Sequence, residues 1–212
     1  MHRPSRRGFI TGVGAITGAL AFLPELAQAE PAADPEWDMS WLDRLKGKHK
    51  QVFDFSDLDI GLIVVKNWLD AWKKVYNLEH PQVNAVVGIG GHAFPVNVSD
   101  EMYRKFPIGE LWKVNDPDTA KPAMRNIFLE GPTAGGSVGA GVRPLQARGA
   151  IFWQCNNALN GVASRIGNAV KRPQPEVYQE LKAALNPGVI LVPAHTMLVG
   201  ICQEKGCSYE GI

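Results

Sequence analysis

Four short, mainly apolar runs recur along the chain, separated by longer stretches in which apolar residues are spaced three or four apart. An uninterrupted apolar run is typical of a strand that is covered on both faces of a sheet. We therefore predict strands at 61–66, 84–89, 150–154 and 189–192, and a short strand after Gly206. The amphipathic stretches predict helices, at 67–79, 99–106, 156–170, 176–185 and 195–205.

Strands that alternate with helices predict βαβ units and therefore an α/β fold with a mostly parallel sheet and helices on both faces. We assign this domain to residues 58–212. It is preceded by an N-terminal arm over 30–57, with one short helix near 41–46. Apolar periodicity is weak from 116 to 148, where clustered glycines predict a flexible insertion.

Three chemically versatile side chains follow predicted strands: His92, Cys155 and His195. The carboxyl ends of parallel strands meet at one edge of the sheet, where ligands bind in open α/β folds. Cys155 lies between a strand and a helix, so the amides and dipole of the helix N-terminus would favour its thiolate. The alternative is a small buried apolar residue, a common role for cysteine.

The two histidines have several possible roles. His92 and His195 could orient a substrate, act as a base toward Cys155, or coordinate a soft metal together with it. The alternative for each is a structural residue that ends a strand, which is the more common role of a single histidine in this position. The glycines at 88, 90 and 91 lack the complete spacing of a dinucleotide-binding loop, so we predict no bound cofactor.

The remaining cysteines, Cys202 and Cys207, do not form a Cys-x-x-Cys motif. Their thiols could meet only if the preceding helix ends at Gly206 and the chain turns back. Otherwise they are two packing residues at a helix end. Because the chain has three cysteines, at least one thiol remains outside any intrachain disulfide.

The N-terminal segment predicts export. Arg6 and Arg7 precede a weakly apolar stretch that ends at Pro24, and Ala27-Gln28-Ala29 resembles a signal-peptidase site. This order is typical of a twin-arginine signal peptide. We expect the twin-arginine (Tat) translocase to deliver the protein to the periplasm, with cleavage near Ala29. The stretch is too short and too weakly apolar for a stable membrane span.

Charge excludes one class of partner. Loss of residues 1–29 would remove Arg3, Arg6, Arg7 and Glu25, changing the formal net charge from +1 to −1. A nearly neutral domain without basic clusters is not expected to bind nucleic acid.

The sequence around Cys155 resembles the DsrE/DsrF-like family. The similarity lies in Phe-Trp-Gln-Cys-Asn-Asn-Ala-Leu at 152–159, in Pro-Gly-Val and Val-Pro-Ala within 187–194, and in Gln-Glu-Lys-Gly at 203–206. It extends over about 58–212 and is poorest over 116–148. The resemblance implies a three-layer α/β/α domain that assembles into trimers or hexamers. It also implies a sulfur relay in which Cys155 carries sulfur as a persulfide.

Two features depart from this family pattern. The relay members act in the cytoplasm beside partner subunits, whereas this chain carries an export signal. Cys202 and Cys207 lie outside the pattern and could be resolving thiols or have no role.

Three functions follow as hypotheses. The first is an exported sulfane-sulfur carrier or sulfurtransferase that acts through Cys155 and exchanges sulfur with a donor and an acceptor. The second is a non-enzymatic periplasmic module that binds a small ligand or a soft metal in the strand-end pocket. The third is a structural subunit that has lost the chemistry.

Overall fold

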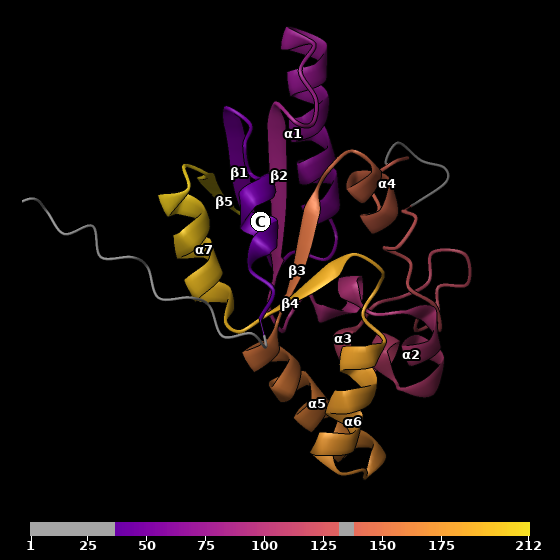
Figure 1. The fold of residues 1–212 in the computed structure, drawn as a ribbon. Helices are drawn as coiled ribbons and strands as arrows, with labels where there is room; N and C mark the ends of the chain where they lie inside the picture. The colour runs from indigo at the N-terminus through magenta and orange to yellow at the C-terminus, as the bar shows by residue number, and fades with distance from the viewer. Residues whose placement is uncertain (1–36, 132–137) are drawn as a thin grey trace, which may run out of the picture. The chain divides into compact units, whose positions relative to one another are not determined.

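The computed structural model describes residues 37–131 and 138–212. The predicted signal peptide and the start of the arm therefore lie outside the described residues, as does part of the glycine-rich loop. Five strands form one sheet in the order β4-β3-β2-β1-β5, and every neighbouring pair is parallel (Figure 1). The strands are β1 His49–Phe55, β2 Val83–Ile89, β3 Ile151–Cys155, β4 Val189–Val192 and β5 Ser208–Gly211.

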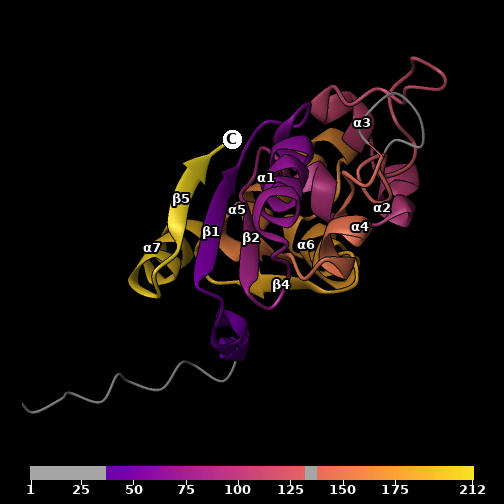
Figure 2. The same ribbon diagram turned by 90° about the horizontal axis from the view of Figure 1, so that it is seen from above.

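Helices cover both faces of this sheet, which confirms the predicted α/β/α arrangement. Helices α1 (Gly61–Tyr76) and α4 (Val142–Ala147) pack on one face, against a cluster that includes Phe53 and Phe152. Helix α7 (His195–Glu204) and the 3-10 helix η1 (Ser40–Arg44) cover the other (Figure 2). Helix η1 overlaps the short helix expected near 41–46.

A second group of helices lies beyond the carboxyl ends of the strands (Figure 1). These helices share their own apolar cluster, which is centred on buried residues such as Phe94 and Leu159. The group consists of η2 Phe94–Asn97, α2 Asp100–Lys105, α3 Ile108–Trp112, α5 Asn156–Val170 and α6 Gln174–Ala183. Within the described ranges, no helix has the length and apolarity needed to cross a membrane.

The predicted strand at 61–66 is wrong, because these residues form the first turns of α1. Buried Leu62, Val65 and Leu69 face the sheet at helical spacing. Lys66 pairs with Asp70 one turn later at 2.7 Å. A short apolar run fits a buried helix as well as a strand, so its composition alone does not distinguish them.

The first strand instead lies within the segment predicted to be an arm. Strand β1 pairs with both β2 and β5 and is therefore internal to the sheet. It buries Val52, Phe53 and Phe55 almost completely, although His49 and Asp54 interrupt its apolar pattern. The other predicted strands, and the helices at 99–106, 156–170, 176–185 and 195–205, are confirmed to within a few residues.

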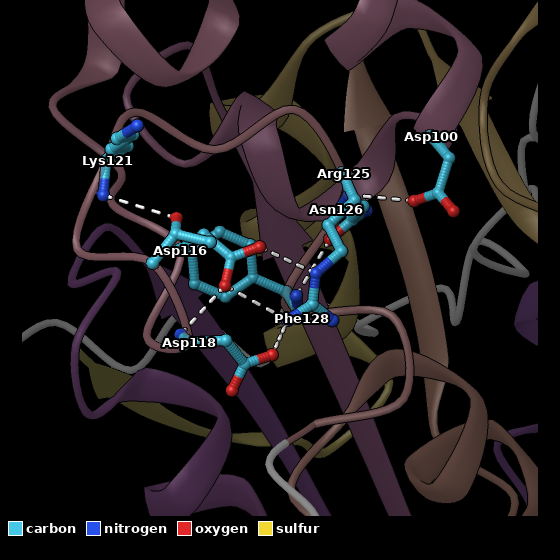
Figure 3. A network of polar contacts seen from close by, with 8 residues as sticks. Asp100, Asp116, Asp118, Lys121, Arg125, Asn126 and Phe128 are labelled. Carbon is cyan, nitrogen blue, oxygen red and sulfur yellow. Dashed lines mark hydrogen bonds and ion pairs between the residues drawn. The ribbon is translucent and has the colours of Figure 1, made fainter.

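The segment predicted as a flexible insertion contains α4 and a fixed polar network (Figure 3). Arg125 donates to Asp116 at 2.7 Å and to Asp118 at 2.6 Å. The hydrogen bonds from Arg125 lower the pKa of the Asp116 carboxyl. The described part of this segment therefore has polar contacts that its apolar periodicity does not reveal.

Asn126 is the buried anchor of the same network. Its side-chain amide donates to the carbonyl oxygens of Val96 at 3.0 Å and Val98 at 2.7 Å. Its oxygen accepts from the Phe128 amide at 2.8 Å, and its backbone amide donates to Asp100 at 2.7 Å. One buried residue thus joins the loop to η2 through its side chain and to α2 through its backbone amide.

Replacing Asn126 with alanine should lower the free energy of unfolding by about 3 kcal/mol, because the Val98 carbonyl and the Phe128 amide lose their hydrogen-bond partner. Urea unfolding followed by circular dichroism measures this change. The matched control is Asp118→Asn, which alters an exposed ion pair of the same network and should cost less than about 1 kcal/mol. Equal losses in the two variants would contradict the anchoring role of Asn126.

Candidate functional site

Cys155 is both the last residue of β3 and the N-cap of α5. Its sulfur accepts a hydrogen bond from the Ala158 amide at 3.4 Å, as an N-cap oxygen does in other helices. The thiol is free, and the residue is 5% exposed. The predicted position between strand and helix is confirmed, and the sulfur lies in a nearly closed environment.

A second helix begins at the same sulfur. Strand β4 pairs with β3 in a register that places Val192 opposite Cys155. After Pro193 and Ala194, helix α7 starts, and the backbone amide of His195 donates to the Cys155 sulfur at 3.3 Å. Two N–H groups from the first turns of two helices therefore converge on one thiol. Both amides donate to the sulfur, and N–H groups at helix N-termini favour negative charge on the atom that they contact.

The His195 ring is held between two other strands. The indole N–H of Trp153 donates to Nδ1 at 3.2 Å, and Nε2 lies 2.8 Å from Oδ1 of Asp54. Because Nδ1 accepts from the indole, Nε2 carries the hydrogen and donates to Asp54. Both ring nitrogens are thus engaged, and the ring is oriented away from use as a base toward Cys155.

Asp54 lies at the centre of this arrangement. It comes from the carboxyl end of β1, and its second oxygen accepts from the Tyr209 hydroxyl on β5 at 2.9 Å. The hydrogen bond to the Asp54 carboxylate raises the pKa of Tyr209. Asp54 therefore links the internal strand β1, on which it lies, to the start of α7 and to the edge strand β5.

Gly88 gives the rings of this cluster the room that they need. It lies on β2, opposite Asp54 on one side and Trp153 on the other. A β-carbon built at Gly88 would come within 2.4 Å of the Trp153 ring and 3.0 Å of the His195 ring. The absence of a side chain at Gly88 lets the Trp153 and His195 rings pack against the sheet. Gly88 therefore serves packing here, whereas the glycines of a phosphate-binding loop serve contact with a ligand.

The sequence pattern did not indicate Asp54 or Tyr209. Asp54 lies in the strand that the pattern missed, so it was not expected at the carboxyl edge of the sheet. The sequence nevertheless contains a signal, which is an acidic residue between two aromatic residues, Phe53 and Phe55. The structure buries both aromatic side chains.

His92 lies apart from these contacts. It is exposed in the turn that follows β2, and its ring makes no hydrogen bond to any residue in the described part of the chain. Within 37–131 and 138–212, no three His, Cys, Asp or Glu side chains are grouped so that they could hold a metal ion. The ligand set of Cys155, His92 and His195 that the second hypothesis allowed is therefore not assembled.

Two surface hollows lie at the opposite edge of the sheet. Their volumes are about 510 and 370 Å³, and both are lined by His80, Gln146 and Gly149. These residues precede β2 and β3, so the hollows open at the amino ends of the strands. Neither hollow is lined by Cys155 or His195, and the strand-end pocket of the second hypothesis is not among them.

No protein-family model matches the chain, and the search of curated proteins finds no match either. The geometry around Cys155 and the sequence resemblance therefore carry the functional argument.

Proposed function

We propose that the protein is an exported, DsrE-like sulfur carrier that takes up sulfane sulfur on Cys155 and passes it to an acceptor. One observation carries this proposal: the Cys155 sulfur accepts backbone N–H groups from both α5 and α7. Both donors reach Sγ, the atom that attacks when sulfur is taken up and that leaves when sulfur is released. Fixed amide donors favour negative charge on this atom in both steps without any side chain that must ionise.

The proposed transfer conserves charge and electrons. The Cys155 thiolate attacks the outer sulfur of a donor persulfide, a new S–S bond forms, and the donor leaves as a thiolate. Attack of an acceptor thiolate on the outer sulfur of the Cys155 persulfide then returns Cys155 to its thiolate form. No net oxidation occurs, and neither step requires a cofactor.

His195 acts in this scheme as a positioning residue. Its ring is fixed by Trp153 and Asp54, and this fixes the backbone amide that faces Cys155. The base role considered for the His195 ring is not part of the proposal, because both ring nitrogens are already engaged. His92 has no part in the proposal, because it is exposed and contacts none of these residues.

The wider proposal includes assembly and location. The resemblance to DsrE/DsrF-like proteins, together with the parallel three-layer fold, supports a homotrimer or homohexamer. The N-terminal pattern supports export through the Tat translocase to the periplasm, where small sulfur species or a partner protein would supply and accept sulfur.

Incubation of the mature protein with polysulfide should add the mass of one or more sulfur atoms to Cys155. Trypsin places Cys155 alone on peptide 149–165, while Cys202 and Cys207 fall on later peptides. Mass spectrometry of the unreduced digest should therefore find the added sulfur on peptide 149–165, and a thiol reductant should remove it.

The matched variant is Cys155→Ser. A serine hydroxyl is a good N-cap and can accept the same amide hydrogens, so the circular dichroism spectrum and the oligomer mass should be retained while sulfur uptake is lost. Sulfur found only on Cys202 or Cys207, or an unmodified peptide 149–165 in folded wild type, would refute the carrier proposal.

A further inference from the structure

Helix α7 ends in a turn that joins Cys202 to Cys207. The Cys207 amide donates to the carbonyl of Cys202 at 2.9 Å, and the Gly206 amide donates to the carbonyl of Gln203 at 2.8 Å. Gly206 has a φ of +83°, which glycine adopts at little cost. This pair of bonds around a left-handed glycine is the Schellman motif.

The motif determines where the two cysteine side chains lie. Its first and last residues commonly make an apolar side-chain contact, and here those residues are Cys202 and Cys207. Both thiols are free, both are buried, and both belong to the apolar cluster under α7. The chain therefore turns back at Gly206, which is the condition under which the two thiols were expected to meet.

The two thiols differ in their electrostatic surroundings. The hydrogen bond from Cys202 and the charge of Lys50 lower the pKa of Cys207. The Lys50 ammonium lies close to this turn, 3.6 Å from a β-carbon built at Gly206. The hydrogen bond to Cys207, followed by burial, raises the pKa of Cys202. Cys207 is also the more accessible of the two, at 6% exposed against 0% for Cys202, and it follows the turn that Lys50 approaches. Cys207 is therefore the thiol better placed to attack first, and Cys202 follows as the second nucleophile.

We propose that Cys202 and Cys207 are a dithiol–disulfide site that closes an intrachain bond when the protein meets a small disulfide oxidant. The Cys207 thiolate attacks one sulfur of the oxidant and expels a thiolate. Cys202 then loses its proton to solvent, attacks the Cys207 sulfur and expels the second thiolate. The pair gives up two electrons and two protons in total, and the oxidant is reduced to two thiols.

Cys155 is separated from this pair by the length of α7. Its sulfur contacts the first residue of the helix, His195, whereas Cys202 lies seven residues later. At about 1.5 Å per residue, Cys202 is roughly 10 Å further along the axis, and a disulfide requires α-carbons within about 7 Å. The pair is therefore expected to close on itself, so this proposal is independent of sulfur transfer by Cys155.

Closing this bond would connect two elements of the candidate site covalently. Helix α7 carries His195 and strand β5 carries Tyr209, and both residues donate to Asp54. The cross-link would join the end of this helix to the start of this strand, at the edge of the sheet opposite Cys155.

The test is oxidation of the native, mature protein with glutathione disulfide, followed by trypsin digestion without reductant. Lys205 separates the two cysteines, so a disulfide between them joins peptides 183–205 and 206–212. We expect this joined species in wild type and, as a matched control, in Cys155→Ser. It should disappear on reduction and be absent from Cys207→Ser.

Three results would overturn the proposal: a link from either cysteine to Cys155, a glutathione adduct on Cys207 that Cys202 does not displace, or unlinked peptides after the oxidant has reached equilibrium. Because the decisive peptides come from the wild-type chain, a variant that fails to fold does not affect the result. The uptake of sulfur by peptide 149–165 is measured separately, so failure of one proposal leaves the other testable.

Discussion

A chain in which Arg6 and Arg7 are both replaced by lysine should accumulate in the cytoplasm as an uncleaved precursor. Lysine keeps the positive charge but lacks the planar guanidinium with its fixed array of donors. If a twin-arginine receptor reads this segment, recognition should be lost although the net charge is unchanged. Cell fractionation and immunoblotting would show the precursor, and the wild-type mature protein should begin at or near Glu30.

Arg3→Lys provides the matched control for export. It makes the same chemical change in the same segment but leaves the arginine pair intact, so export and cleavage should continue. Normal periplasmic accumulation of the Arg6→Lys, Arg7→Lys double variant would disprove the predicted route, and failure of Arg3→Lys would show that the pair itself is not what is recognised.

Replacing Gly88 with alanine should destabilise the protein by about 2–3 kcal/mol, the usual cost of overpacking a filled core. The added methyl group would lie 2.4 Å from the Trp153 ring, which is completely buried. It would also press on the His195 ring and so disturb the hydrogen bonds that join Trp153 to His195 and His195 to Asp54. A loss of this size should lower the melting temperature by roughly 8 °C in a domain of this length.

Gly90→Ala is the matched control for Gly88→Ala. It lies two residues later on the same segment, and a β-carbon there would have no neighbour within 4 Å. Its stability should therefore stay within about 0.5 kcal/mol of wild type. Equal melting temperatures for the two variants would show that the packing of Trp153 and His195 does not restrict position 88 to glycine.

Most of the architecture could be predicted because the apolar runs that form β2, β3 and β4 have the length and composition of buried strands. The exception is instructive. The run at 61–66 is as apolar as a strand, but burial at Leu62, Val65 and Leu69 shows that a helix uses it. Strand β1 has polar residues at several positions, so its burial depends on neighbouring strands that a local pattern does not reveal.

Only part of the candidate site could be predicted, because one of its residues lies on β1, the strand that the apolar pattern does not reveal. Cys155 and His195 follow strands that the pattern identifies, and the structure places the His195 amide on the Cys155 sulfur. The partner of the His195 ring, Asp54, belongs to the strand that was missed. The contact between Cys202 and Cys207 depends on the turn at Gly206, and the spacing Cys-x-x-x-Gly-Cys fits the positions of a Schellman motif.

The position of β1 between β2 and β5 has a consequence for how the chain folds as it is synthesised. Asp54 is made early, but its partners His195 and Tyr209 follow 141 and 155 residues later. Contacts of such sequence separation form slowly because a long loop must close first. Until the C-terminal segment emerges and docks, one edge of β1 has no partner strand, and Cys155 lacks the amide of His195. A nascent chain therefore passes through a stage in which this thiol lacks one of its two amide partners, and docking of α7 and β5 ends that stage.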